Sequence, residues 1–275
     1  MIEAIVCEGA PRDLGRDQGR ACADRLRAGF ASLPLARRLR LRPGAGAAAA
    51  GGLRRELRRH FPRQAETLVG IAGAAGVPAA WLEACLDAEG AAPEPELAIA
   101  VEGEGPQARV LRSLAGEWIL RRSQPEGCFR SVEITRPWLA HALLGVNEAG
   151  LAAAVVTPAG AAARAGLPSA PLIQDCLQRF AALEAALEWC LGRPAERDAA
   201  LILADAHGEL AAVEITASGR RVLRPADGWL AVGGSAAARA ELAKQLRERN
   251  PTPAPLLAAD PTARELEIAG ARYGC

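Results

Sequence analysis

Three residues of the chain could take part in acyl chemistry: Arg112, Cys128 and Asn147. A thiolate attacks amide and thioester carbonyls, and arginine or asparagine side chains can stabilise the negative charge that develops on the carbonyl oxygen. Each residue also has a structural explanation. Asparagine is favoured in turns, a half-buried cysteine is common where a strand starts, and a buried Arg112 would need a carboxylate partner, for which Glu117 and Glu133 are candidates.

No metal or cofactor is predicted. The chain has three histidines, which lie far apart in the sequence, and its seven cysteines lack the paired spacing of zinc sites. The histidines are His60, His141 and His207. We therefore expect chemistry that depends on the protein's own side chains.

A basic row on one predicted helix could contact phosphate. No aromatic residues interleave with it and the net charge of the chain is +1, so a solvated surface is the favoured interpretation. We expect no nucleic-acid partner. The row consists of Arg54, Arg55, Arg58 and Arg59.

The length and composition indicate one globular domain over residues 1–275. Half of the 275 residues are hydrophobic, which suffices for a large core. No stretch approaches the roughly 20 apolar residues of a membrane-spanning helix, and the first residues do not resemble a secretory signal. An odd number of unpaired cysteines fits a reducing compartment, so we expect a cytoplasmic protein.

The first third of the chain, residues 1–95, is predicted to be helical after a short strand at 4–7. Apolar residues recur at helical spacing over 11–32, over 53–77 with an interruption at Pro62, and from Pro78 onward. The low-complexity segment 43–52 is expected to be a loop.

Residues 96–275 are predicted to form a sheet core with helices. Helices are expected at 168–180, 183–191, 235–249 and 261–269. Short turn-bounded runs predict strands at 97–101, 109–114, 128–135, 142–146, 151–157, 200–204, 210–216, 220–224 and 229–232.

The order of these elements favours an α+β fold over alternating parallel units. Strands such as LAAAVV (151–156) are apolar at every position and must be covered on both faces. A four-layer αββα sandwich, with two antiparallel sheets between helical layers, meets that requirement.

Four segments together resemble one superfamily. GAPRDLGRDQG (9–19) and LVGIAGAAGVP (68–78) resemble signatures of the acyl-coenzyme A:6-aminopenicillanic acid acyltransferases. GVNEAGL (145–151), and LADAHG (203–208) followed by Val213 and Glu214, are similar to hairpins of those proteins, the first of which they share with choloylglycine hydrolases and penicillin V amidases. The resemblance implies the N-terminal-nucleophile (Ntn) hydrolase fold, in which a precursor cuts itself before a cysteine at a strand start.

The resemblance also implies that the nucleophile position is degenerate. It would fall at Leu97 or Ala98, and no Ser, Thr or Cys occurs in the 27 residues from Leu86 to Arg112. Neither Leu97 nor Ala98 can attack a carbonyl.

Other positions match the superfamily in part. Arg112 matches an arginine beside the nucleophile, and Asn147 matches a residue that helps to hold the oxyanion. The expected Asp is absent at Ala115, which leaves Glu117 as a displaced candidate. A later Asn-His pair is replaced by Gly233 and Gly234, which removes a second oxyanion donor. Losing one such donor typically costs about 10² to 10³ in rate.

Three hypotheses follow. The preferred one is a pseudoenzyme of a linear-amide hydrolase or acyltransferase family that is not processed and that binds an acyl-amide, a peptide-like ligand or a pathway enzyme. The second is an active amide hydrolase or acyltransferase that uses Cys128, supported by Arg112, Glu117 and Asn147. The third is an interaction protein without a pocket, which is distinguished by whether Arg112 and Asn147 line a common cavity. A homodimer is an open alternative for its assembly.

Overall fold

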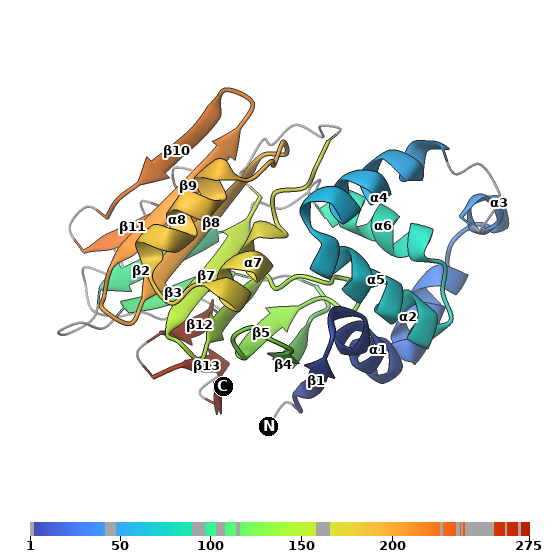
Figure 1. The fold of residues 1–275 in the computed structure, drawn as a ribbon, viewed down its shortest axis with the longest axis horizontal. Helices are drawn as coiled ribbons and strands as arrows, with labels where there is room; N and C mark the ends of the chain where they lie inside the picture. Colours follow the sequence, from blue (N-terminus) through green and yellow to red (C-terminus); the bar gives the residue numbers. More distant parts are fainter. Residues whose placement is uncertain are drawn as a thin grey trace.

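The computed structural model describes residues 3–41, 48–89, 97–102, 108–113, 116–157, 166–225, 228–234, 237, 239, 256–261, 263–268 and 271–275. In this part of the chain, two β-sheets pack against each other and a helical region lies to one side (Figure 1). The α+β fold with two packed sheets is therefore confirmed.

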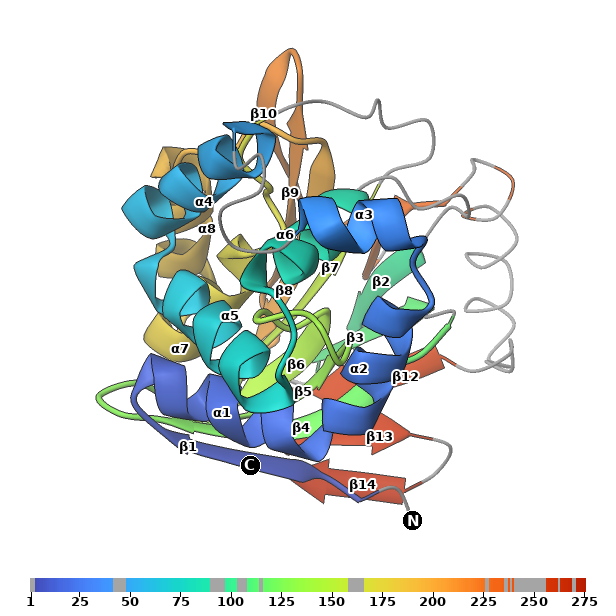
Figure 2. The ribbon, with the colours of Figure 1, turned by 90° about the vertical axis from the view of Figure 1, so that its right-hand side faces the viewer.

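Within the described residues, six helices follow the first strand, and two later helices cover the larger sheet (Figures 1 and 2). Pro11 and Pro62 begin two of them, since the first turn of a helix needs no backbone N–H from its first residue. The helices are α1 (Pro11–Ala21), α2 (Ala23–Ala31), α3 (Leu35–Arg40), α4 (Ala48–His60), α5 (Pro62–Ala75), α6 (Ala79–Glu89), α7 (Leu172–Arg179) and α8 (Leu183–Gly192).

Helices α1 and α5 contain the two glycine-bearing segments of the family resemblance, and they pack directly on each other. A Cβ atom added to Gly15 would lie 2.0 Å from the carbonyl oxygen of Thr67, and one added to Gly70 would lie 2.2 Å from that of Arg12. These glycines are required by close backbone packing, so both segments have a structural explanation.

The large sheet has the strand order β1-β4-β5-β6-β7-β8-β9-β10, and only its β1–β4 pair is parallel. The small sheet has the order β11-β2-β3-β12-β13-β14 and is antiparallel. The strands are β1 (Ile5–Gly9), β2 (Leu97–Glu102), β3 (Ala108–Ser113), β4 (Ile119–Pro125), β5 (Ser131–Thr135), β6 (Leu144–Asn147), β7 (Leu151–Val156), β8 (Ala199–Asp205), β9 (Leu210–Thr216), β10 (Gly219–Leu223), β11 (Trp229–Gly233), β12 (Leu256–Asp260), β13 (Glu265–Ile268) and β14 (Ala271–Gly274).

The apolar central strands divide their side chains between two cores. On β7, Leu151, Ala153 and Val155 pack toward the helices, whereas Ala152, Ala154 and Val156 pack toward the small sheet. Strand β8 alternates in the same way. The prediction that these strands are covered on both faces is confirmed.

Three sequence-based element predictions are wrong. The described residues of 261–269 form β13 and part of the turn before it instead of a helix, because antiparallel pairing of β12 with β3 and of β13 with β12 determines their structure. Residues 48–52 belong to α4 instead of a loop. Cys128 lies in the turn between β4 and β5, three residues before the strand it was expected to start.

A further helix was predicted at residues 235–249. Residues 237 and 239 are helical, and the others lie outside the described residues.

Candidate functional site

The register of the small sheet places the expected nucleophile position next to Arg112. Strand β2 lies between β11 and β3, with Ala98 opposite Arg112 on one side and Leu97 opposite Gly233 on the other. The Ala98 side chain is fully buried and packs in the core between the sheets. Arg112 shares that face, because residues directly opposite each other in an antiparallel pair point the same way.

Arg112 is 1% exposed, and its Nη1 donates a hydrogen bond to the carbonyl oxygen of Leu143 at 2.8 Å. The expected ion pair with Glu117 or Glu133 is not formed. Glu133 pairs with Arg121, and the exposed Glu117 lies 3.6 Å from Arg25. Ala115 lies outside the described residues.

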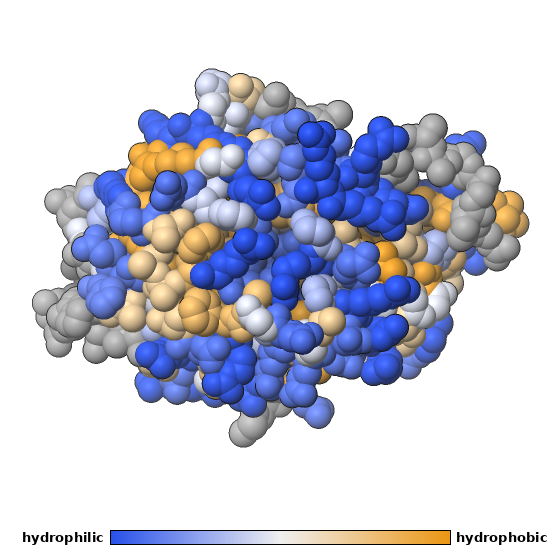
Figure 3. All heavy atoms as spheres, viewed as in Figure 1, coloured by the Kyte–Doolittle hydropathy of each residue, from blue (hydrophilic) through white to orange (hydrophobic). Residues whose placement is uncertain are grey.

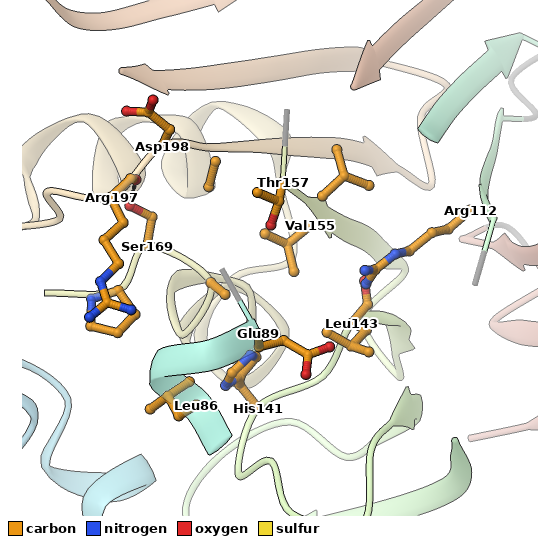
Figure 4. Close-up of a pocket in the computed structure, with 14 residues that line it drawn as sticks. Leu86, Glu89, Arg112, His141, Leu143, Val155, Thr157, Ser169, Arg197 and Asp198 are labelled. Atoms are coloured by element: carbon orange, nitrogen blue, oxygen red, sulfur yellow. Dashed lines mark hydrogen bonds between the residues drawn. The ribbon is translucent and has the colours of Figure 1, made fainter. Parts of the chain in front are cut away.

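A cavity lies at this end of the sandwich, between α6, the start of β6, the end of β7 and the segments before α7 and β8 (Figure 4). It contains about 450 Å³ of empty space, including space open to solvent. Its apolar walls include Leu86, Leu143, Val155, Val156, Pro168, Ala170 and Ala199, and its polar lining includes Glu89, Arg112, His141, Thr157, Ser169, Arg197 and Asp198. This cavity combines an aliphatic wall with a buried guanidinium.

His141, in the same cavity, was not assigned a role from the sequence. Its side chain is 1% exposed, and its Nε2 has no hydrogen-bond partner among the described residues. Burial, together with the positive charges of Arg121 and Arg112, lowers the pKa of His141 from 6.5 to about 3. The ring is therefore a neutral imidazole at physiological pH. A lone histidine in an irregular segment carries no sequence signal that could have identified it.

Two other charged groups of the cavity are held in ion pairs. Glu89 pairs with Arg136, and Arg197 pairs with Asp87 and donates to the carbonyl oxygen of Gly166 at 3.1 Å. The Ser169 hydroxyl donates to the backbone carbonyl of Arg197. Since that hydroxyl bonds to a carbonyl and not to a general base, it lacks the partner that activates a serine nucleophile.

The structure does not bring Asn147 to this cavity, so Arg112 and Asn147 do not line a common cavity. The observation that was to favour the first hypothesis over the third is therefore not made, although Arg112 does line a cavity. Asn147 ends β6, at the opposite end of the strand from Leu144, and its side chain is fully buried. Its Nδ2 donates to the carbonyl oxygens of Leu177 and Phe180 at 2.9 and 2.8 Å. Its Oδ1 accepts hydrogen bonds from the backbone N–H groups of Ala149 and Leu151.

The hydrogen-bonding capacity of the Asn147 amide is thus used to join the β6–β7 turn to the end of α7. The turn's positive φ lies at Gly150, at 90°, and not at Asn147.

Cys128 also lies away from the cavity. It is partly exposed in the β4–β5 turn, and that end of β5 pairs with Asn147 through Ser131. No cysteine occurs among the described residues that line the cavity.

Gly233 and Gly234, at the predicted oxyanion position, have positive φ values of 75° and 58°. Their carbonyl oxygens accept hydrogen bonds from Nη1 of Arg239. Glycine provides no side-chain donor, so neither residue can supply the second oxyanion donor that the resemblance implies.

A second group of buried polar side chains, which we term the Arg121 cluster, joins α1, β4, β5 and α7. Its members are Gln18, Arg121, Ser123, Ser131, Glu133 and Gln174. Arg121 Nε donates to Glu133 at 2.7 Å, and its Nη1 donates to Gln18 at 2.6 Å. Burial opposes ionisation of Glu133, but Arg121 and the bonds from Ser131 and Gln174 outweigh it and lower its pKa. This cluster is closed by its own hydrogen bonds.

The basic row on α4 is a solvated surface with one ion pair. Arg54 donates to both carboxylate oxygens of Glu83, at 2.6 and 3.0 Å, while Arg55, Arg58 and Arg59 are exposed. Figure 3 shows hydrophilic residues gathered over α4.

Among the described residues, no group of His, Cys, Asp and Glu is arranged to hold a metal ion. Within the same residues, no helix has the length and apolar character needed to cross a bilayer.

Comparison with solved structures finds low similarity to amide hydrolases. A Caenorhabditis elegans ortholog of N-acylethanolamine-hydrolysing acid amidase matches with a TM-score of 0.45 and 11% identity, over 60% of this chain and 93% of that one. Penicillin V acylase from Agrobacterium tumefaciens matches with a TM-score of 0.38 and 21% identity, over 55% of this chain and 57% of its own.

A variant of conjugated bile acid hydrolase from Clostridium perfringens matches with a TM-score of 0.38 and 13% identity, over 55% of this chain and 57% of its own. These proteins belong to the superfamily that the sequence segments resemble. No protein-family model and no curated protein sequence matches the chain.

Proposed function

We propose that this protein is a non-catalytic, unprocessed binding protein with an amide-hydrolase-like fold, and that its cavity takes a small acyl-amide ligand. The observation that carries this proposal is the composition of the cavity. Arg112 and His141 face a space with aliphatic walls, while Ala98, the residue opposite Arg112, offers only a methyl group.

The aliphatic wall suits an acyl chain. Burying each methylene group of a ligand contributes about 0.8 kcal/mol before the cost of association is subtracted. The polar lining residues can then bind and orient the hydrogen-bonding head group of the ligand. A short N-acyl amide has both parts.

The alternative is an active hydrolase that uses Cys128. Its proposed catalytic residues do not lie close enough together to act on one carbonyl group. Cys128 and Asn147 lie toward one end of the large sheet, whereas Arg112 lines the cavity at the other. A nucleophile and its supporting groups must meet within hydrogen-bonding reach of one carbonyl group. Glu117 forms a surface ion pair with Arg25 and does not line the cavity.

Isothermal titration calorimetry with N-hexanoylglycinamide tests the proposal. We expect the wild-type protein to bind it with a dissociation constant of about 1 mM or lower, which corresponds to about −4 kcal/mol or better. Ala170→Phe, which fills the cavity from its half-buried rim, should weaken binding at least about tenfold.

Two control variants test whether the loss of affinity depends on the position of the substitution in the cavity. Ala36→Phe makes the same change on the exposed surface of α3 and should leave the affinity unchanged. Arg112→Met should weaken binding, whereas Arg109→Met, an exposed arginine on the same strand, should not. Absence of binding by the wild-type protein, or equal affinities for the A170F and A36F variants, would contradict the proposal.

A further inference from the structure

Two buried cysteines lie against each other in the helical layer over the large sheet, outside the cavity. The Sγ atoms of Cys176, in α7, and Cys190, in the last turn of α8, are 3.4 Å apart. Both side chains are 0% exposed and belong to the same hydrophobic core. All seven cysteines lie within the described residues, and no other two of them have sulfur atoms in contact.

The two helices hold the sulfur atoms in this contact. Helix α7 packs on β6 and β7, and α8 packs on β8 and β9, so the pair lies between neighbouring helices of one layer (Figure 1). The carbonyl oxygen of Cys190 accepts a hydrogen bond from Nη1 of Arg220 at 2.5 Å, and that of Cys176 accepts one from the N–H of Phe180. The sulfur atoms need to approach by about 1.4 Å to reach bonding distance, which side-chain rotation and a small shift of α8 can supply.

We propose that Cys176 and Cys190 form a reversible disulfide bond that links α7 to α8, with a low-molecular-weight disulfide such as oxidised glutathione as the oxidant. The thiolate of one cysteine attacks a sulfur atom of the oxidant, and one glutathione thiolate leaves. The second cysteine then attacks the protein sulfur of this mixed disulfide, and the other glutathione thiolate leaves. The two thiol protons of the protein end on the two glutathiones. The cysteine pair loses two electrons, and the glutathione disulfide gains them.

Cys190 is the first cysteine to react in this scheme. It precedes Leu191, which is 43% exposed, near the end of α8, so local opening of the last helical turn brings it to solvent. The hydrogen bond with Cys190, together with burial, raises the pKa of Cys176 well above its usual value of 9.0. Only a thiolate attacks, and this hydrogen bond is lost once Cys190 is modified, so Cys176 is the second to react.

Counting free thiols by mass spectrometry tests the proposal. The reduced wild-type protein is incubated overnight with oxidised glutathione, then unfolded and labelled with iodoacetamide. We expect two fewer labels than the seven of the reduced protein, and a linked pair of peptides that contains Cys176 and Cys190. Dithiothreitol should restore all seven labels. Glutathione adducts on exposed thiols such as Cys275 are recognised by their added mass and are counted separately.

Cysteine variants identify the pair. Cys176→Ala and Cys190→Ala should each abolish the intramolecular bond. Cys22→Ala, which changes a cysteine that is also buried but has no sulfur neighbour, is the matched control and should still form the bond. The wild-type measurement keeps the test decisive if one of these variants does not fold.

The melting temperature shows whether the bond fits the folded protein. A disulfide between residues 14 positions apart restricts the unfolded chain, so the oxidised protein should melt at least about 3 °C above the reduced protein. Seven free thiols after the incubation, a linkage that involves another cysteine, or a lower melting temperature of the linked protein would overturn the proposal.

Discussion

The Arg121 cluster and the cavity at Arg112 each contain a buried arginine, and they differ in how their polar groups are satisfied. Arg121 donates to Glu133, Gln18 and Gln174, and Glu133 in turn accepts from Ser123 and Ser131. The cavity is instead lined by His141, whose buried Nε2 has no hydrogen-bond partner among the described residues. Buried polar groups with complete hydrogen bonds stabilise a fold, and a group without them needs an explanation, of which a bound ligand is one.

Asn147 and His141 illustrate the same contrast on either side of β6. Asn147 belongs to a segment with a family resemblance, yet its amide is fully used within the fold. His141 has no sequence signature, yet its ring lines the cavity. Completeness of hydrogen bonding therefore separates the structural residue from the candidate binding residue.

The largest expected effect follows from breaking the Arg121 cluster. Glu133→Ala leaves Arg121 buried without its carboxylate, and such a loss typically destabilises a protein by about 3–5 kcal/mol. Urea unfolding measures the free energy of unfolding. Glu214→Ala, which removes the partner of the exposed Arg221, should cost less than about 1 kcal/mol. Similar losses for both variants would show that the cluster does not stabilise the fold.

The second prediction concerns pH and His141. In the unfolded chain this histidine binds a proton below pH 6.5, whereas in the folded protein its pKa is about 3. Between those values the unfolded state binds more protons, so the free energy of unfolding should fall as the pH drops from 6.5 toward 3. In His141→Gln this contribution is absent, and the stability should change less with pH. Parallel pH curves for the two proteins would contradict the burial of a neutral ring, which is packed near Arg112, Arg121, Glu89, Arg197 and Asp198.

A smaller effect is expected from Asn147→Ala. The substitution leaves two carbonyl oxygens and two backbone N–H groups without their side-chain partner, which should cost about 1–3 kcal/mol of stability. The affinity for N-hexanoylglycinamide should not change, because Asn147 does not line the cavity. A tenfold loss of affinity in a folded variant would place Asn147 in the binding site after all.

The smallest effect is expected from Cys128→Ala. A partly exposed turn residue away from the cavity should change stability by less than about 0.5 kcal/mol and leave affinity unchanged. Competition between N-hexanoylglycinamide and iodoacetamide labelling provides the check. If the amide protects Cys128 from labelling, this thiol belongs to a functional site.

The sequence predicts the elements whose own periodicity determines them. The helices around Pro62 and the two-faced strands β7 and β8 lie where apolar spacing places them. Strand β4 (ILRRSQP) was missed because its buried Arg121 is compensated by Glu133 and Gln174, which no local pattern reveals. The hairpin of β12 and β13 was also missed, since pairing with the distant β3 overrides a local pattern that resembles a helix.

The residues of the candidate site could likewise be predicted only in part from the sequence. The neighbouring positions of Arg112, Ala98 and Gly233 follow from the resemblance, and the strand register brings them together. His141, Glu89 and Arg197 come from a loop, a helix end and the segment before β8, and only the folded chain places them around one cavity. Spatial convergence of irregular segments leaves no periodic signal in a sequence.

Mass spectrometry of the purified protein after incubation with N-hexanoylglycinamide tests most directly the claim that the chain binds an amide without processing itself or cutting the ligand. We predict one polypeptide of about 28.6 kDa and an unchanged amount of the amide. Two fragments divided near residue 96, or release of a carboxylic acid from the amide in amounts exceeding one per protein molecule, would contradict the account.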